Sequence, residues 1–319
     1  MRIVVVAPNT TILPPPKDGG TERVVYELSE QYAKRGHDVF LYGRGGSRSS
    51  GTLFSYPFDG FGDAEIRRFV EHTLPPDVDI IHDHTFESAV SSLELDIPVI
   101  STRHIPRQTS ASHPVYVSRD ALMSIGGGNG IYIHNGLVPE HYDFRTQKQN
   151  YLLFMGRIVP EKGVSEAIDI AEKTNSQLII AGPIHNAGYF NTRIKPRLRK
   201  NKITYVGPVG AQQRQDLLSN ARCLLFPIQW REPFGLVMIE ALACGTPVLA
   251  LNRGAAAEVL NGLPDFVCHS LKEMERKVAN VHLRHAPAQL REYVVHNFNQ
   301  NSTADQYIQY FNEVIAQKA

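Results

Sequence analysis

Short apolar runs alternate along the chain with segments whose apolar residues recur at helical spacing. Apolar runs of about four to eight residues bounded by Gly and Pro are typical of buried strands. In the first half we expect strands near residues 2–8, 38–43, 79–84, 98–104, 115–118 and 131–135. In the second half we expect them near 151–156, 177–182, 203–206, 223–228 and 248–251. Strands that alternate with helices predict an α/β fold with parallel sheets.

The chain is long enough for two domains. Its 319 residues compare with about 150 residues for a typical domain. The polar run 145–150 is typical of an interdomain linker. We therefore expect one domain in residues 1–146 and a second in residues 147–299. Residues 303–319 then form a final amphipathic helix, because their apolar side chains recur at helical spacing.

Composition and charge narrow the classes of function. A net charge of +1 with 20% charged residues describes an ordinary soluble protein and gives no sign of a nucleic-acid partner. No apolar run approaches the ~18 residues of a transmembrane helix, and the apolar start ends at Pro8, too early for a signal peptide. Cys223, Cys244 and Cys268 lack zinc spacing and are typical of free thiols in a reducing cytosol. We expect a cytoplasmic protein.

The segment 223–251 carries the strongest chemical signal. A strand, a loop containing Pro and Gly, an apolar helix over 236–244 and a second strand follow one another. Glu240 is the only charged residue between Glu232 and Arg253, and an unpaired buried charge is costly. Parallel α/β sheets bind ligands at the carboxyl ends of their strands, and free N–H groups at a helix start favour a phosphate. Glu240 is then placed to accept two hydrogen bonds from a diol such as ribose.

Two further loops carry groups suited to a phosphate. Arg157 and Lys162 follow an expected strand, and fixed cations there would stabilise the charge of a leaving diphosphate. Gly19 and Gly20 precede an expected helix, for which Thr21 is the expected N-cap. Their amides could face a phosphate or a sugar. Each of these features alone is also typical of an ordinary surface loop. The dinucleotide-binding Gly-x-Gly-x-x-Gly fingerprint is absent from the expected strand-to-helix junctions.

Residues 231–248 resemble the Glu-x7-Glu motif of the retaining family 4 glycosyltransferases, and Gly156 to Gly163 resembles that family's Gly-Arg…Lys-Gly pattern. The resemblance implies a GT-B fold, in which two Rossmann-like parallel-sheet domains face each other across a cleft. It implies that the last helix, about residues 300–319, packs back on the first domain. It also implies transfer of a sugar from a nucleoside-diphosphate donor, for which a UDP-sugar is the preferred expectation. The acceptor is a hydroxyl group, and the anomeric configuration is retained.

The resemblance further implies roles for individual residues. Glu232 would contact the donor sugar, and Glu240 would hold the ribose hydroxyls. Arg157 and Lys162 would clamp the diphosphate. His104, at the end of a strand, would reach the sugar at the reacting centre. The remaining donor-binding positions are Phe234, Gly235, Leu236, Gly19, Gly20 and Gly207.

The family's chemistry requires no metal, so we expect neither an essential Mg²⁺ nor a cofactor besides the nucleotide sugar. The expected acceptor is an unknown glycan, lipid-linked or small molecule, used in cell-envelope or polysaccharide synthesis. The basic cluster, defined as Arg193, Lys195, Arg197, Arg199, Lys200 and Lys202, is by default a solvated helix face. The alternative for this cluster is a peripheral contact with an anionic acceptor or the inner face of a membrane.

Several alternatives stay open. A buried helix whose Glu240 pairs with a neighbouring arginine would explain the strongest motif without a ligand. A nucleotide-sugar epimerase of the same fold would use acid/base carboxylates such as Asp83 and Glu87. A non-catalytic nucleotide-sugar-binding module would bind the donor without turnover. His82 and His84 share one face of a strand end, where they either line the acceptor side of the cleft or bind a metal.

Overall fold

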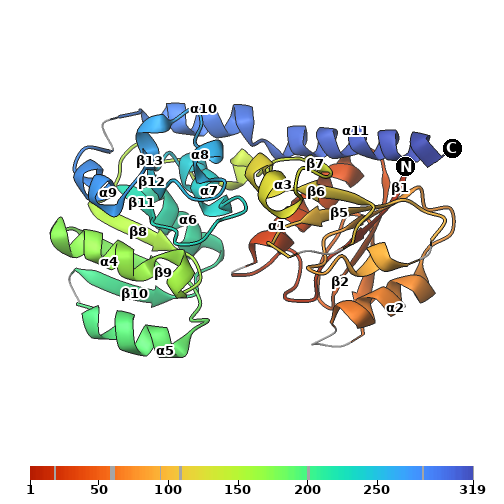
Figure 1. Ribbon diagram of the computed structural model, residues 1–319, viewed down its shortest axis with the longest axis horizontal. Helices are drawn as coiled ribbons and strands as arrows, with labels where there is room; N and C mark the ends of the chain where they lie inside the picture. Colours follow the sequence, from red (N-terminus) through yellow and green to blue (C-terminus); the bar gives the residue numbers. More distant parts are fainter. Residues whose placement is uncertain are drawn as a thin grey trace. The chain divides into compact units, whose positions relative to one another are not determined.

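The computed structural model describes residues 1–17, 19–57, 62–93, 95–107, 110–199, 202–281 and 284–318. The chain divides into two compact units: unit 1 is Met1–Val138 with Asn299–Ala319, and unit 2 is Pro139–Phe298. Each unit is built around one parallel sheet accompanied by helices (Figure 1). The expected fold class, α/β with two Rossmann-like parallel-sheet domains, is confirmed. None of the helices in the described ranges combines the length and the apolar character that crossing a bilayer demands.

Unit 1 contains a seven-stranded sheet in the order β3-β2-β1-β4-β5-β6-β7, with every neighbouring pair parallel. Its strands are β1 (Arg2–Val6), β2 (Asp38–Arg44), β3 (Thr52–Tyr56), β4 (Ile80–Asp83), β5 (Val99–Arg103), β6 (His113–Tyr116) and β7 (Ile131–Tyr132). Its helices are α1 (Gly20–Lys34), α2 (Asp63–Thr73), α3 (Arg119–Ile125) and α11 (Gln300–Lys318). The central strand β1 is apolar at successive positions because both of its faces are buried.

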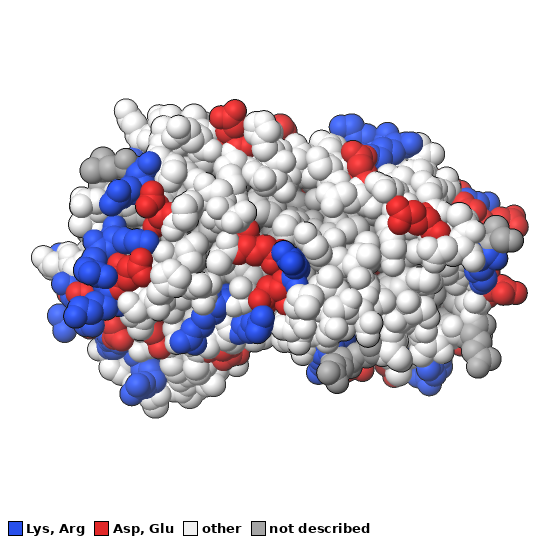
Figure 2. Space-filling model, turned by 45° about the horizontal axis from the view of Figure 1, so that its top comes forward, with Lys and Arg blue, Asp and Glu red and all other residues white. Residues whose placement is uncertain are grey.

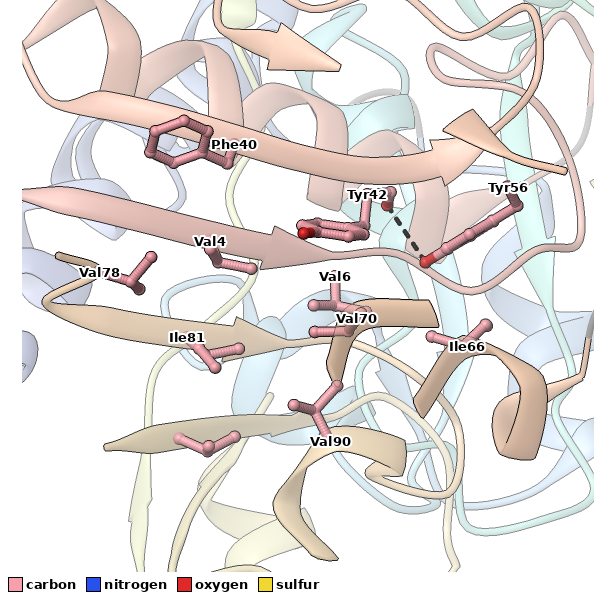
Figure 3. Packing of buried hydrophobic residues seen from close by; sticks show 11 residues of the cluster. Val4, Val6, Phe40, Tyr42, Tyr56, Ile66, Val70, Val78, Ile81 and Val90 are labelled. Carbon is pink, nitrogen blue, oxygen red and sulfur yellow. Dashed lines mark hydrogen bonds between the residues drawn. The ribbon is translucent and has the colours of Figure 1, made fainter. Parts of the chain in front are cut away.

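A cluster of apolar side chains packs α2 against the sheet of unit 1 (Figure 3). Ile66 and Val70 of α2 belong to the same buried cluster as Val6 of β1 and side chains of the neighbouring strands. Each fully buried aliphatic side chain stabilises the fold by about 1.5–3 kcal/mol. At the edge of the cluster the Tyr56 hydroxyl donates to the Tyr42 carbonyl, 3.4 Å away. The polar end of this buried ring is therefore satisfied.

The last helix belongs to unit 1. It lies along α1 (Figure 1), and there Phe311 meets Tyr32 edge to face with ring centroids 5.5 Å apart. Tyr307 is fully buried, and its hydroxyl lies 2.9 Å from Thr102 Oγ1 of β5. The C-terminal helix therefore reaches a strand that leads directly to His104.

Unit 2 contains a six-stranded parallel sheet in the order β10-β9-β8-β11-β12-β13. Its strands are β8 (Tyr151–Met155), β9 (Gln177–Ala181), β10 (Ile203–Gly207), β11 (Cys223–Phe226), β12 (Val248–Leu251) and β13 (Val267–Cys268). Its helices are α4 (Val164–Lys173), α5 (Ala187–Tyr189), α6 (Ala211–Asn220), α7 (Leu236–Ala243), α8 (Ala256–Val259), α9 (Leu271–Val278) and α10 (Pro287–Asn297). Because β8 and β11 are parallel neighbours, the loops that follow them leave the same edge of the sheet.

The structure corrects the sequence expectations at two points of organisation. The strands at 52–56 and 267–268 are missing from the expected set. Both are short edge strands with little burial on one side, so their hydrophobic pattern is weak. The run 145–150 is not a linker, because it lies inside unit 2. There Lys148 Nζ donates to two backbone carbonyls of unit 2 at 2.8 and 2.9 Å.

Candidate active site

The loop between β11 and α7 makes a tight entry into the helix. Gly235 is the N-cap of α7 with a φ of 87°, a left-handed backbone conformation that favours glycine. A Cβ at this position would lie 2.7 Å from Met238 Cε and 3.1 Å from Phe226 Cζ. The rest of α7 is buried from Met238 onwards. The expected strand, loop, apolar helix and strand over residues 223–251 are confirmed.

Glu240 projects from the buried helix α7 toward a cation. Its side chain is only 4% exposed, and Arg214 of α6, itself 16% exposed, forms an ion pair with Oε2. The Tyr142 hydroxyl donates to Oε1 at 3.2 Å. The cation that a buried carboxylate requires is therefore supplied by the protein. The pairing with a neighbouring arginine, one of the open alternatives, is what the structure contains.

Glu232 lies in the loop between β11 and α7 and is the centre of a second charged group. Lys162 Nζ donates to Glu232 Oε2 at 2.5 Å, and Trp230 Nε1 donates to the same oxygen at 2.6 Å. The ammonium group also lies 5.0 Å from the centroid of the Trp230 ring, within the range of a cation–π interaction. The side chains of Lys162 and Glu232 are 14% and 11% exposed, so this pair is largely screened from solvent.

Backbone contacts bring Lys162 to Glu232. Lys162 ends the 3₁₀ turn Pro160–Lys162, which follows β8, and Gly163 comes next with a φ of 80°. A Cβ at Gly163 would lie 1.9 Å from the Pro227 carbonyl oxygen, so only glycine allows this approach to β11. The Gln229 amide then donates to the Glu161 carbonyl at 2.8 Å. The two loops are thus tied together beside the candidate residues.

The other donor-side positions of unit 2 follow β8, end β10 or lie at the start of α7. Arg157 follows the neighbouring strand β8 and is exposed, and its guanidinium makes no hydrogen bond or ion pair to another described residue. Phe234 packs on Phe298 with ring centroids 5.8 Å apart, next to Leu236, the first residue of α7. Gly207 ends β10 with a φ of 81°, and a Cβ there would meet open space.

Gly19 and Gly20 form the start of α1, and the expected cap is wrong. Gly19, with a φ of 132°, is the N-cap in place of Thr21, which lies inside the helix. A Cβ on Gly19 would lie 2.8 Å from Pro15 Cβ. The buried Glu22 carboxylate occupies the first turn. It already supplies the negative charge that a helix N-terminus favours.

The histidines of unit 1 form a connected cluster. His82 Nε2 lies 2.8 Å from Thr102 Oγ1, and His82 Nδ1 lies 3.2 Å from the Tyr32 hydroxyl. His84 Nε2 lies 3.3 Å from His82 Nδ1, and His84 Nδ1 lies 2.9 Å from His104 Nε2. The three imidazoles therefore lie at the carboxyl ends of β4 and β5 and contact one another in a chain.

Burial holds these imidazoles in the neutral form. Loss of solvation lowers the pKa of His82 and of His84 well below the usual value, and the neighbouring histidines lower both further. Burial also lowers the pKa of His104 to about 3, with Arg103 contributing a smaller repulsion. Three neutral rings can share hydrogen bonds, whereas three imidazolium ions at this spacing would repel one another.

The metal alternative for His82 and His84 finds no support in the ring geometry. The two ring nitrogens of His84 face two different histidines, so nitrogens of the cluster do not converge on a single point. Within the described part of the chain, no group of three or more His, Cys, Asp or Glu side chains is arranged to hold a metal ion.

The carboxylates that an epimerase would use are engaged elsewhere. Asp83 is buried, and its oxygens accept hydrogen bonds from the amides of Thr85 and Val90. Burial raises the pKa of Asp83 to about 6, against the lowering effect of these hydrogen bonds. Glu87 forms an exposed ion pair with Arg107. Both carboxylates therefore already have partners within unit 1.

One member of the basic cluster, Arg197, is paired with two acidic neighbours. Arg197 Nη2 lies 2.6 Å from Asp169 and 2.7 Å from Glu172. Lys202 Nζ donates to the Asn175 carbonyl at 3.2 Å. Lys200 lies outside the described residues. Figure 2 shows basic and acidic side chains interspersed on the drawn face.

Several residues of these groups are missing from the sequence expectations. Trp230 could have been found, because it is the chain's single tryptophan and stands two residues before Glu232. Arg214 is 26 positions from Glu240 and carries no local signal. Tyr32 and Tyr307 look like core aromatic residues of amphipathic helices.

Comparison with protein families gives two matches. Residues 143–275 match the family described as Glycosyl transferases group 1. Residues 18–124 match the family described as Glycosyltransferase Family 4. The first match contains Arg157, Lys162, Glu232 and Glu240, and the second contains the histidine cluster.

Relatives with known names support these matches. A phosphatidyl-myo-inositol mannosyltransferase of Mycobacterium tuberculosis is 25% identical over 82% of this chain and 80% of its own length. A glycogen synthase of the same species is 25% identical over 84% of this chain and 82% of its own length. An uncharacterized glycosyltransferase of Methanocaldococcus jannaschii is 29% identical, and the aligned region spans 37% of that protein.

Solved structures agree in fold. AviGT4, a glycosyltransferase involved in avilamycin A biosynthesis, superposes with a TM-score of 0.83 at 26% identity, over 99% of this chain and 98% of its own. Anabaena HepE in complex with UDP-glucose superposes with a TM-score of 0.76 at 15% identity, over 98% of this chain and 100% of its own. On a GT-B fold, the chain therefore carries a glycosyl transferases group 1 domain in residues 143–275 and a glycosyltransferase family 4 domain in residues 18–124.

Proposed function

We propose that the protein transfers a sugar from a nucleoside-diphosphate donor to an acceptor hydroxyl with retention of anomeric configuration. The observation that carries this proposal is the pairing of Lys162 with Glu232 at the carboxyl ends of the neighbouring strands β8 and β11. A buried Glu240 follows eight residues later in α7. Two carboxylates and a cation at one sheet edge suit a ligand that carries hydroxyls and a diphosphate.

Each charged group has a task in this reaction. Arg157 and Lys162 stabilise the diphosphate, whose charge grows as the sugar–phosphate bond breaks. Glu240, as one half of an ion pair, presents only acceptor oxygens, which suit the hydroxyls of a ribose. Glu232 contacts the donor sugar. The amides of Phe234, Gly235 and Leu236 approach the sugar and the diphosphate at the start of α7, the end of a helix that favours an anion.

The histidines serve the sugar and the acceptor. With a pKa of about 3, His104 is a poor base near neutral pH, so it acts by hydrogen bonding to a sugar hydroxyl. His82 and His84 belong to the acceptor side. The leaving phosphate takes the proton of the acceptor hydroxyl on the same face of the sugar, which gives retention without a protein nucleophile. Gly19, Gly20 and Gly207 complete the donor contacts.

The proposal includes several finer assignments. Unit 1, which includes the last helix, forms the acceptor-side domain, and unit 2 forms the donor-binding domain. A UDP-sugar is the preferred donor, supported by the UDP-glucose complex of Anabaena HepE. The acceptor is a glycan, lipid-linked or small molecule of cell-envelope or polysaccharide synthesis. The enzyme works in the cytoplasm, with a peripheral place at the inner membrane face, and needs no Mg²⁺.

Thermal unfolding in the presence of UDP, GDP, ADP and dTDP tests the proposal. A ligand at about 100 times its dissociation constant stabilises the folded state by about 2.7 kcal/mol. We expect one nucleotide, UDP first, to raise the unfolding temperature, and the matching nucleotide sugar to be consumed when acceptors are added. Interconversion of the donor sugar without an acceptor would indicate an epimerase instead. Binding of the nucleotide sugar without hydrolysis or transfer would indicate a non-catalytic module.

A further inference from the structure

Trp230, the only tryptophan in the chain, contacts both members of the Lys162–Glu232 pair. Its indole N–H donates to Glu232 Oε2 at 2.6 Å, the oxygen that also accepts from Lys162 Nζ at 2.5 Å. The face of the same ring lies 5.0 Å from the ammonium nitrogen. One side chain thus meets the carboxylate through its edge and the cation through its face, as its charge distribution favours.

The backbone holds Trp230 in register with both partners. Its neighbour Gln229 donates its amide to Glu161, in the same turn as Lys162, at 2.8 Å. Arg253 Nη1 donates to the Gln229 carbonyl at 2.7 Å. The segment is fixed from two sides, so the indole has a defined position relative to the pair. A tryptophan that served only to pack the core would not require contacts with the carboxylate and the ammonium group.

We infer that Trp230 is a positioning residue of the donor site and that its indole keeps Glu232 in place when Lys162 turns to a bound diphosphate. This inference rests on the proposed function. In the structure Lys162 is paired with Glu232, and a bound diphosphate competes with this carboxylate for the ammonium group. Once Lys162 leaves, the carboxylate keeps the N–H of Trp230, a hydrogen bond strengthened by the charge. Glu232 therefore keeps one hydrogen-bond partner, the indole N–H, when the donor binds.

The same contacts make Trp230 an internal reporter of the site. Indole fluorescence responds to charges near the ring, and the cation and the carboxylate both touch this one. In the ligand-free protein we expect Glu232→Gln and Lys162→Met each to shift the emission maximum. Tyr293→Phe is the matched control, because it removes an aromatic hydroxyl that donates to the Val259 carbonyl at 2.9 Å in unit 2. An emission maximum that is unchanged in both site variants would contradict the contact of the indole with Lys162 and Glu232.

Titration with UDP, or with the nucleoside diphosphate that stabilises the protein against heat, tests the movement of Lys162. We expect a saturable emission change with the diphosphate and none with uridine, which lacks phosphate. Lys162→Met should abolish the change. A nucleotide that binds in the thermal assay without altering emission overturns this inference and leaves the proposed function intact. Absence of nucleotide binding in that assay overturns the proposed function, and this inference falls with it.

The variant Trp230→Phe distinguishes a role in positioning Glu232 from a role in packing alone. Phenylalanine keeps an aromatic face for Lys162 but has no N–H for Glu232. We expect UDP affinity to change by less than about threefold while turnover of the nucleotide sugar falls roughly tenfold, the value of one charge-assisted hydrogen bond. Tyr293→Phe should alter neither value. A Trp230→Phe variant with full turnover, or one that loses nucleotide affinity and turnover in parallel, contradicts the positioning role.

Discussion

The buried candidate side chains of unit 2 are charged and paired, whereas the histidines of unit 1 are neutral and hydrogen-bonded to one another. In unit 2 Lys162 meets Glu232 and Arg214 meets Glu240, each pair largely buried. In unit 1 His82 and His84 share hydrogen bonds with each other and with His104, and within the described ranges neither pairs with a carboxylate. Both groups stand at the carboxyl ends of parallel strands, so the position in the fold is the same and the chemistry differs.

The difference follows from the partners available to each buried group. A buried charge persists only where an opposite charge and hydrogen bonds replace water. An imidazole without such a partner loses its proton, because burial lowers its pKa. Unit 2 therefore offers fixed charges, which suit a diphosphate and a ribose. Unit 1 offers neutral donors and acceptors, which suit the hydroxyl groups of a sugar or an acceptor.

Removing the cation from the first pair should have the largest effect on activity. Lys162→Ala takes away charge stabilisation of the leaving diphosphate, and we expect kcat to fall by roughly 10²–10³. Steady-state kinetics with the nucleotide sugar measure this loss. Lys173→Ala, which removes an exposed lysine paired with Glu275 at 3.6 Å, is the matched control. Near-normal turnover in Lys162→Ala would remove this residue from the proposed mechanism.

Breaking the second pair should chiefly reduce stability and donor affinity. Glu240→Gln leaves the Arg214 guanidinium without its counter-ion, and the loss of one partner from a buried pair costs about 3–5 kcal/mol. Urea unfolding measures the stability, and calorimetric titration measures nucleotide affinity. Arg68→Met, at an exposed pair with Glu65, should cost less than about 1 kcal/mol. Equal losses in the two variants would show that Glu240 and Arg214 do not act as a buried pair.

In both units the sequence predicted local elements better than contacts between distant segments, for a physical reason. The apolar run around Glu240 and the glycine at 235 are local patterns, so strand, loop and helix could be placed from them. The partners Arg214 and Trp230 depend on how segments meet in space. The histidine cluster depends on two parallel strands and on the last helix, which brings Tyr307 from 205 positions away to Thr102. No local pattern predicts such a contact.

The stability of the protein should fall in acid because the histidine cluster is neutral in the folded state. Burial lowers the pKa of His82, His84 and His104, so these imidazoles are neutral in the folded state, whereas in the unfolded state they take up protons below about pH 6.5. Asp83, whose pKa is raised to about 6, acts in the opposite direction, because its carboxyl keeps a proton in the folded state that it releases in the unfolded state. The three histidines outnumber this carboxyl, so stability rises with pH through this acidic range and is lost as pH falls.

Urea unfolding at several pH values checks this slope. His84→Gln should reduce this dependence of stability on pH, because one group that takes up a proton on unfolding is removed. His72→Gln, at an exposed position of α2, is expected to leave it unchanged. A wild-type stability that is flat between pH 4 and pH 6 would mean that the buried histidines accept protons without unfolding, and the contrast between the two units would disappear.

The smallest expected effect lies at the far end of the cluster. Tyr307→Phe removes a buried hydroxyl 2.9 Å from Thr102 Oγ1, and one hydrogen bond contributes about 1 kcal/mol to stability. Urea unfolding should show this loss without a change in the slope against urea. Tyr310→Phe, one turn away on α11, makes the same substitution at a partly exposed ring. Because Thr102 also contacts His82 at 2.8 Å, Tyr307→Phe should shift the nitrogen resonances of that imidazole, whereas Tyr310→Phe should not. Unchanged resonances in both variants would confine Tyr307 to a packing role and separate the last helix from the histidines.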